Sequence, residues 1–187
     1  VPGRGIDEVA RELGREPTSL VKLSANENPL GAPPEAVQAL SRVEAAMSSY
    51  PKSAVVDLQA AVAAELGLDR TQIWLAAGAD GAIDYLHRAM VRPGDRVLTP
   101  QPGFAYYGMS ARYHHAEVDS YQLEAADDFV QDPLRILDAY DGHRVLFLTT
   151  PNNPTGTELS PSGIREVAAA VNAETLVVID EAYGEFS

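Results

Sequence analysis

Two short, wholly apolar runs near the end of the 187-residue chain restrict its fold more than any other feature. They are Val145-Leu146-Phe147-Leu148 and Leu176-Val177-Val178-Ile179, and each has the length and composition of a buried strand. Stretches with apolar residues at helical spacing lie between these runs and the other candidate strands. Strands separated by helices favour βα units and a mainly parallel sheet.

The same reasoning predicts the other elements. Residues 1–33 form an N-terminal segment, irregular over 15–33 and rich in Pro, Gly and Asn, and an α/β domain is expected over 34–187. The expected strands are 73–77, 96–99, 116–118, 144–149 and 175–180, and the expected helices are 6–13, 34–47, 54–66, 82–91, 104–112, 133–140 and 162–171.

Composition excludes several classes of function. The chain has no cysteine, which excludes disulfides and thiolate chemistry, and its four histidines lack the spacing of metal ligands, so we expect no metal site. A net charge of −13 argues against nucleic-acid or anionic-membrane partners. We find no signal peptide and no apolar run long enough to span a membrane, and we expect a cytoplasmic protein.

Polar residues follow both apolar runs, where open α/β sheets bind their ligands. Thr150–Gly156 reads Thr-Pro-Asn-Asn-Pro-Thr-Gly, and Asp180–Tyr183 reads Asp-Glu-Ala-Tyr. A partly buried Asp180 needs a hydrogen-bonding or cationic partner, and a protonated pyridine nitrogen is one such partner. Local turn chemistry around Asn153 and a helix-capping role for Asp180 are the competing interpretations.

Two weaker signals precede these motifs. Gly78-Ala79-Asp80-Gly81 lies before a predicted helix, where backbone N–H groups and the helix dipole can bind an anion. A tight turn capped by Asp80 is the alternative. Phe104 follows a predicted strand and can stack on a planar ring, although a core aromatic would fit equally.

In their order along the chain these segments resemble the fold-type I pyridoxal-phosphate aminotransferases, and most closely the histidinol-phosphate aminotransferase group. The resemblance implies a three-layer α/β/α large domain with a mainly parallel sheet. It also rests on further segments, namely Lys22–Gly31, Tyr50-Pro51 and Val91-Arg92-Pro93-Gly94-Asp95.

The resemblance implies a role for each matching residue. The backbone of Ala79 and Asp80 would hold the cofactor phosphate, and Phe104 would stack on the pyridine ring. Asn153 and Tyr183 would bond the ring 3′-oxygen. Asp180 would keep the ring nitrogen protonated. Tyr50 would reach the phosphate bound by the neighbouring subunit of a homodimer.

Two departures from the family pattern stand out. Gly81 occupies a position where the group usually carries Glu. The Schiff-base lysine, which the family places beyond the Asp-Glu-Ala-Tyr strand, is absent, since Lys22 and Lys52 match other positions. We therefore expect about half of an active site, with no catalytic residue of its own and an incomplete large domain.

The implied activity is transfer of an amino group between glutamate and a keto substrate in histidine biosynthesis, with small molecules as partners. The isolated chain is expected to be inactive. Another fold-type I enzyme, such as an aromatic aminotransferase or a threonine-phosphate decarboxylase, is one alternative. A non-catalytic dimerisation module is the other.

Overall fold

The computed structural model describes residues 3–43, 48, 50 and 52–187. The chain divides into two compact units, with the boundary between Asp57 and Leu58. The predicted N-terminal segment over residues 1–33 stays a prediction.

The first unit holds helix α1 (Ile6–Leu13), the 3₁₀ turn η1 (Pro17–Ser19) and helix α2 (Pro34–Leu40). As predicted, α1 ends at a glycine: Gly14 has φ of +62°, which favours glycine. Helix α2 ends earlier than the predicted residue 47. Just after Leu40 the Ser41 hydroxyl donates to the Gln38 carbonyl at 2.7 Å and competes with the helical ladder. Residues 44–47 lie outside the described residues.

The second unit is built on a four-stranded parallel sheet in the order β2-β1-β3-β4. The strands are β1 (Arg96–Gln101), β2 (Glu117–Gln122), β3 (Val145–Thr149) and β4 (Leu176–Asp180). The predicted α/β class with a mainly parallel sheet is confirmed. In β3 and β4 the two apolar runs pair directly, with Val145 opposite Leu176 and Thr149 opposite Asp180.

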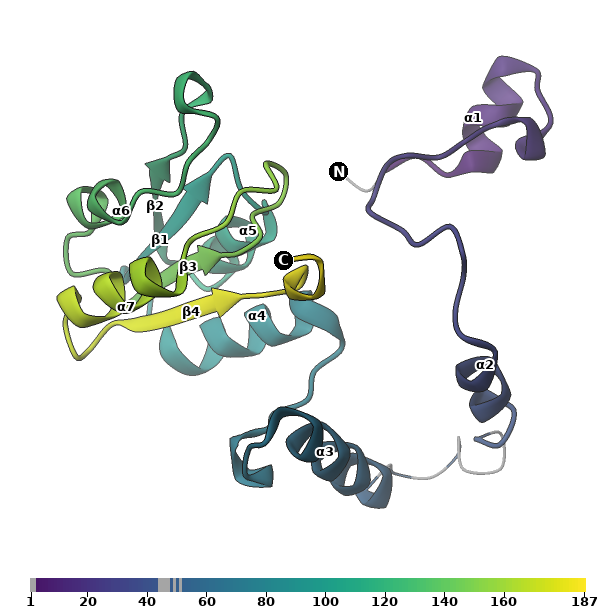
Figure 1. Cartoon of the computed structure of the whole chain (residues 1–187), viewed down its shortest axis with the longest axis horizontal. Helices are drawn as coiled ribbons and strands as arrows, with labels where there is room; N and C mark the ends of the chain where they lie inside the picture. The colour runs from purple at the N-terminus through teal and green to yellow at the C-terminus, as the bar shows by residue number, and fades with distance from the viewer. Residues whose placement is uncertain (1–2, 44–47, 49, 51) are drawn as a thin grey trace. The chain divides into compact units, whose positions relative to one another are not determined.

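Helices cover both faces of this sheet, which gives three layers (Figure 1). Helices α4 (Gly78–Met90) and α5 (Tyr106–Tyr113) lie on one face, and α6 (Pro133–Ala139) and α7 (Pro161–Ala170) lie on the other. Alternation along the strands divides the core: Val145 and Phe147 pack toward α4 and α5, whereas Leu146 and Leu148 pack toward α6 and α7.

One predicted strand is absent from the described part of the chain. Residues 73–77 are extended between η3 (Arg70–Gln72) and α4, and no strand pairs with them among the described residues. The Ile73 carbonyl instead accepts from Gln59 Nε2 of helix α3 (Lys52–Leu66) at 3.0 Å. An apolar run becomes a strand only where a neighbouring backbone completes its ladder, and none does so here. Short 3₁₀ turns, η4 (Ala125–Asp127) and η5 (Gly184–Phe186), complete the unit.

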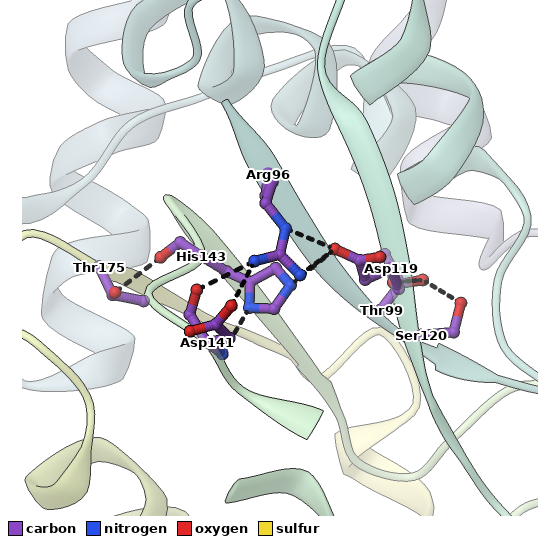
Figure 2. Close-up of polar contacts among 7 residues, drawn as sticks. All are labelled: Arg96, Thr99, Asp119, Ser120, Asp141, His143 and Thr175. Atoms are coloured by element: carbon purple, nitrogen blue, oxygen red, sulfur yellow. Dashed lines mark hydrogen bonds and ion pairs between the residues drawn. The ribbon is translucent and has the colours of Figure 1, made fainter. Parts of the chain in front are cut away.

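A polar cluster joins the amino-terminal ends of the strands (Figure 2). Asp119 Oδ2 accepts from Arg96 Nε at 2.8 Å and lies 3.0 Å from Nε2 of the fully buried His143. His143 Nδ1 accepts from the Asp141 backbone N–H at 3.1 Å, so its ring proton is on Nε2 and donates to Asp119. The His143 bond is the main cause that lowers the pKa of Asp119, with the Arg96 bond adding to it. The cluster stabilises the end of the sheet opposite the polar motifs.

Among the described residues, no helix combines the length and the apolar character that a bilayer crossing requires.

Candidate functional site

A cavity of about 120 Å³ opens at the carboxyl ends of β3 and β4. Its lining brings together residues from the first turn of α4, the loop after β1, α5, β3, β4 and the segments after β3 and β4. The lining residues are Ala79, Phe104, Tyr107, Thr149, Asn153, Asp180, Ala182 and Tyr183. Five of the seven residues that the sequence suggested for cofactor binding therefore share one cavity.

Asp180 is held by two donors. Its Oδ2 accepts from the Tyr107 hydroxyl at 2.6 Å, and its Oδ1 accepts from the Ala182 backbone N–H at 3.0 Å. The second bond closes a turn directly after β4. The next helical turn, η5, begins only at Gly184 and has no side-chain cap, so the competing helix-capping role for Asp180 is wrong. The parallel register places Asp180 opposite Thr149, with its side chain on the α4–α5 side of the sheet.

Tyr107 is the buried partner that the sequence motifs did not identify. Its ring is fully buried, stacks on Phe147 with centroids 4.3 Å apart, and meets the Phe104 ring edge-on at 5.5 Å. Burial, and then the bond to Asp180, raise the pKa of the Tyr107 phenol, so it remains protonated. Its contact joins α5 to a residue of β4 that lies 73 positions further along the chain.

Asn152 ties two of the cavity loops together. It is 2% exposed, and its Nδ2 donates to the Pro102 carbonyl at 3.1 Å and to Thr155 Oγ1 at 2.8 Å. Pro102 lies two residues before Phe104, and Asn152 immediately precedes Asn153. The relative placement of the Phe104 ring and the Asn153 amide therefore depends on a side chain that sequence reasoning treated only as part of a turn.

The Gly78–Gly81 segment is the first turn of α4, rather than a separate turn before a helix that begins at residue 82. Gly78 has φ of +70°, and no side chain caps the helix from the preceding Ala77. The alternative of a turn capped by Asp80 is therefore wrong. Ala79 lines the cavity, whereas Asp80 is exposed next to it and is not among the lining residues.

Tyr50 belongs to the other compact unit, where its side chain is 91% exposed. Its expected contact with a neighbouring subunit stays a prediction.

Comparison with known proteins decides the family. Residues 18–187 match the family of class I and II aminotransferases. The chain belongs to this family. This match confirms the family resemblance drawn from the motifs. Class I and II aminotransferases use pyridoxal phosphate.

Individual aminotransferases agree with this placement. The chain is 57% identical over 185 residues to a histidinol-phosphate aminotransferase of Natronomonas pharaonis and 53% identical over 187 residues to that of Haloferax volcanii. These matches cover 99% and 100% of the chain but only 52% of either relative. The chain thus spans about half the length of these curated relatives.

Solved structures show the same correspondence. The crystal structure of histidinol-phosphate aminotransferase from Sinorhizobium meliloti in complex with pyridoxal-5′-phosphate matches with a TM-score of 0.84 and 26% identity, over 100% of this chain and 50% of that one. An aspartate aminotransferase from Thermus thermophilus with maleate matches with a TM-score of 0.78 and 25% identity, over 93% and 48%. The expected three-layer architecture of the aminotransferase large domain is confirmed.

Proposed function

We propose that this chain is the pyridoxal-phosphate-binding half of a histidinol-phosphate aminotransferase, which transfers an amino group between glutamate and a keto substrate. The identities of 57% and 53% to relatives of that name, across the whole chain, support the substrate class. The single observation that carries the cofactor site is that Asp180, Phe104 and Ala79 line one cavity.

The lining residues fit a planar, anionic heterocycle. Phe104 offers an aromatic face and Asp180 a carboxylate in the same cavity, which suits a ring that carries a proton on nitrogen. The first backbone N–H groups of a helix have no partner within the helix, and Ala79 and Asp80 lie in the first turn of α4. When bound, pyridoxal phosphate supplies a protonated ring that withdraws electrons from the substrate carbon.

The remaining residues complete the proposed site. The Asn153 amide and the Tyr183 hydroxyl would donate to the ring 3′-oxygen, since both residues line the cavity. Tyr50 would come from the second subunit of a homodimer in the cytoplasm. The lysine that holds the cofactor covalently has no counterpart here, so this chain alone is expected to bind the cofactor without turning over substrate.

Two alternatives remain distinct from this proposal. The solved aspartate aminotransferase of Thermus is about as similar in sequence as the solved histidinol-phosphate enzyme, at 25% against 26%, so the fold alone does not select the substrate. A non-catalytic dimerisation module is the second alternative. The length of the parent reading frame distinguishes it, because an enzyme requires a second half that bears the lysine.

The test compares the 187-residue chain with the product of the complete reading frame, which the proposal expects to be the longer protein. With pyridoxal phosphate and glutamate, the longer protein should convert the imidazole ketone phosphate to histidinol phosphate, and the short chain should not. An absorption band near the visible edge should form only in the longer protein. Activity on aromatic keto acids without activity on the imidazole substrate would overturn the substrate class.

A further inference from the structure

We propose that Tyr107 is a positioning residue that fixes the Asp180 carboxylate for contact with a protonated ring nitrogen. The inference rests on the function proposed above, because it concerns the same cavity. It starts from the 2.6 Å contact between the Tyr107 hydroxyl and Asp180 Oδ2.

The direction of each hydrogen bond follows from the number of protons. An ionised carboxylate only accepts, so the single phenolic proton of Tyr107 lies toward Asp180. The Thr149 hydroxyl is 2.9 Å from the same phenolic oxygen and therefore donates to it. The result is a chain of donors from Thr149 through Tyr107 to Asp180, in which each bond polarises the next.

The carboxylate is anchored at both oxygens. Tyr107 holds Oδ2 from helix α5, and the Ala182 backbone N–H holds Oδ1 from the segment after β4. Two donors on separate elements oppose rotation of the carboxylate group. Each oxygen retains acceptor capacity for a further donor, and Asp180 lines the cavity in which such a donor would bind.

The Tyr107 ring also orients the aromatic face of the cavity. It meets Phe104 edge-on at 5.5 Å and is itself held by stacking on Phe147 at 4.3 Å. One buried side chain thus sets the positions of both features that would contact a planar ring. Loss of its hydroxyl alone would leave the aromatic contacts in place and would release Oδ2 of Asp180 together with the Thr149 hydroxyl.

The variant Tyr107→Phe isolates this hydroxyl, and Tyr121→Phe is its matched control. Tyr121 is also buried, at 1% exposure, and its hydroxyl donates to the Phe147 carbonyl at 3.1 Å, but it does not line the cavity. The probe is deoxypyridoxine phosphate, which keeps the ring nitrogen and the phosphate but lacks the aldehyde, so its binding requires no lysine. Calorimetric titration of the 187-residue chain gives the dissociation constant, and near-UV circular dichroism checks that each variant is folded.

We expect Tyr107→Phe to weaken binding of the probe by about tenfold, and Tyr121→Phe to change it by less than about twofold. In an Asp180→Asn background, Tyr107→Phe should change affinity by less than about twofold, because the hydroxyl acts through the carboxylate. A purely structural role would weaken binding equally in both backgrounds.

Three results would overturn the inference: equal affinities of the two Tyr variants, tighter binding by Tyr107→Phe, or the same loss with and without Asp180→Asn. In each of these cases the unchanged chain still binds, so the proposed function stands. No binding of the probe by the unchanged chain would instead remove the cavity as a pyridine site, and both proposals would fail.

Discussion

Asn152 Nδ2 lies 3.1 Å from the Pro102 carbonyl oxygen, and this hydrogen bond joins the loop that carries Phe104 to the loop that carries Asn153. The relative positions of Phe104 and Asn153, which both have proposed roles in the site, thus depend on one buried amide. Substitution Asn152→Ala removes both of its donor bonds and leaves the half-buried Pro102 carbonyl without that partner. We expect the free energy of unfolding to fall by about 2 kcal/mol in urea titrations. Asn172→Ala, at an exposed position, should change it by less than about 0.5 kcal/mol, and equal effects would contradict this role.

The two glycines of the α4 first turn should respond in opposite directions to the same substitution. A Cβ at Gly81 would meet only the Ala77 and Ala76 side chains and backbone at 3.5 Å or more, so Gly81→Ala is expected to stabilise the chain by about 0.5–1 kcal/mol. At Gly78 the φ of +70° disfavours any L side chain, and Gly78→Ala should destabilise it by about 1 kcal/mol. Thermal unfolding of both variants measures the difference. A stabilising Gly78→Ala would refute the left-handed conformation.

His87 should make the stability of the chain depend on pH. The ring is fully buried between α4 and α5, its Nδ1 lies 2.9 Å from Ser110 Oγ, and burial lowers its pKa to about 4, with the charge of His114 as a smaller cause. The unfolded chain takes up this proton near pH 6.5, whereas the folded chain takes it up only near pH 4. The folded state is therefore favoured above pH 6.5 and loses stability as pH falls from there to about 4, on the order of 3 kcal/mol in total.

The His87 prediction is checked by urea unfolding at several pH values. His87→Gln removes the titrating ring and should flatten the change in unfolding free energy between pH 6.5 and pH 4. His115→Asn is the control, because His115 is exposed and its φ of +60° is one that asparagine tolerates. An unchanged slope in His87→Gln would show that another group is responsible.

The two edges of the sheet differ in how they resist self-association. Edge strand β2 carries the charges of Glu117 and Asp119, whereas edge strand β4 is apolar apart from Asp180, and its Ile179 is 43% exposed. Unpaired apolar edges promote association between chains. We expect light scattering to show a dimer or larger species, and Ile179→Lys to lower the apparent mass. Leu134→Lys, on the exposed side of α6, should not, and a monomeric unchanged chain would refute the prediction.

The sequence was most informative where structure depends on local composition. The apolar runs located β3 and β4 to within a residue. Strand β2 was predicted too short, because Asp119, Ser120 and Gln122 read as loop residues although Asp119 is paired with Arg96 and His143. The predicted strand at 73–77 shows the opposite error. Its apolar residues suggest a strand, but no neighbouring strand pairs with them among the described residues.

The candidate site was predictable in its motifs but not in its supporting contacts. The Asn153 and Asp180–Tyr183 motifs lie at the carboxyl ends of β3 and β4, so the rule for ligand sites in open sheets locates them. The prediction of buried strands holds for β3, which is buried throughout, but is wrong for the half-buried β4. The bond from Tyr107 to Asp180 joins residues 73 positions apart, and the packing of α5 against the sheet decides it. Neither spacing nor composition indicates such a pair.

The pairing of Thr149 with Asp180 limits which insertions and deletions β4 can accept during evolution. Because alternate β4 residues face opposite layers, deletion of one residue within Leu176–Ile179 would turn the aspartate toward α6 and α7 and away from Tyr107. Deletion of two residues would restore its direction. Length changes in this strand are therefore tolerated, if at all, in even steps, whereas the loop before α6 is under no such parity constraint.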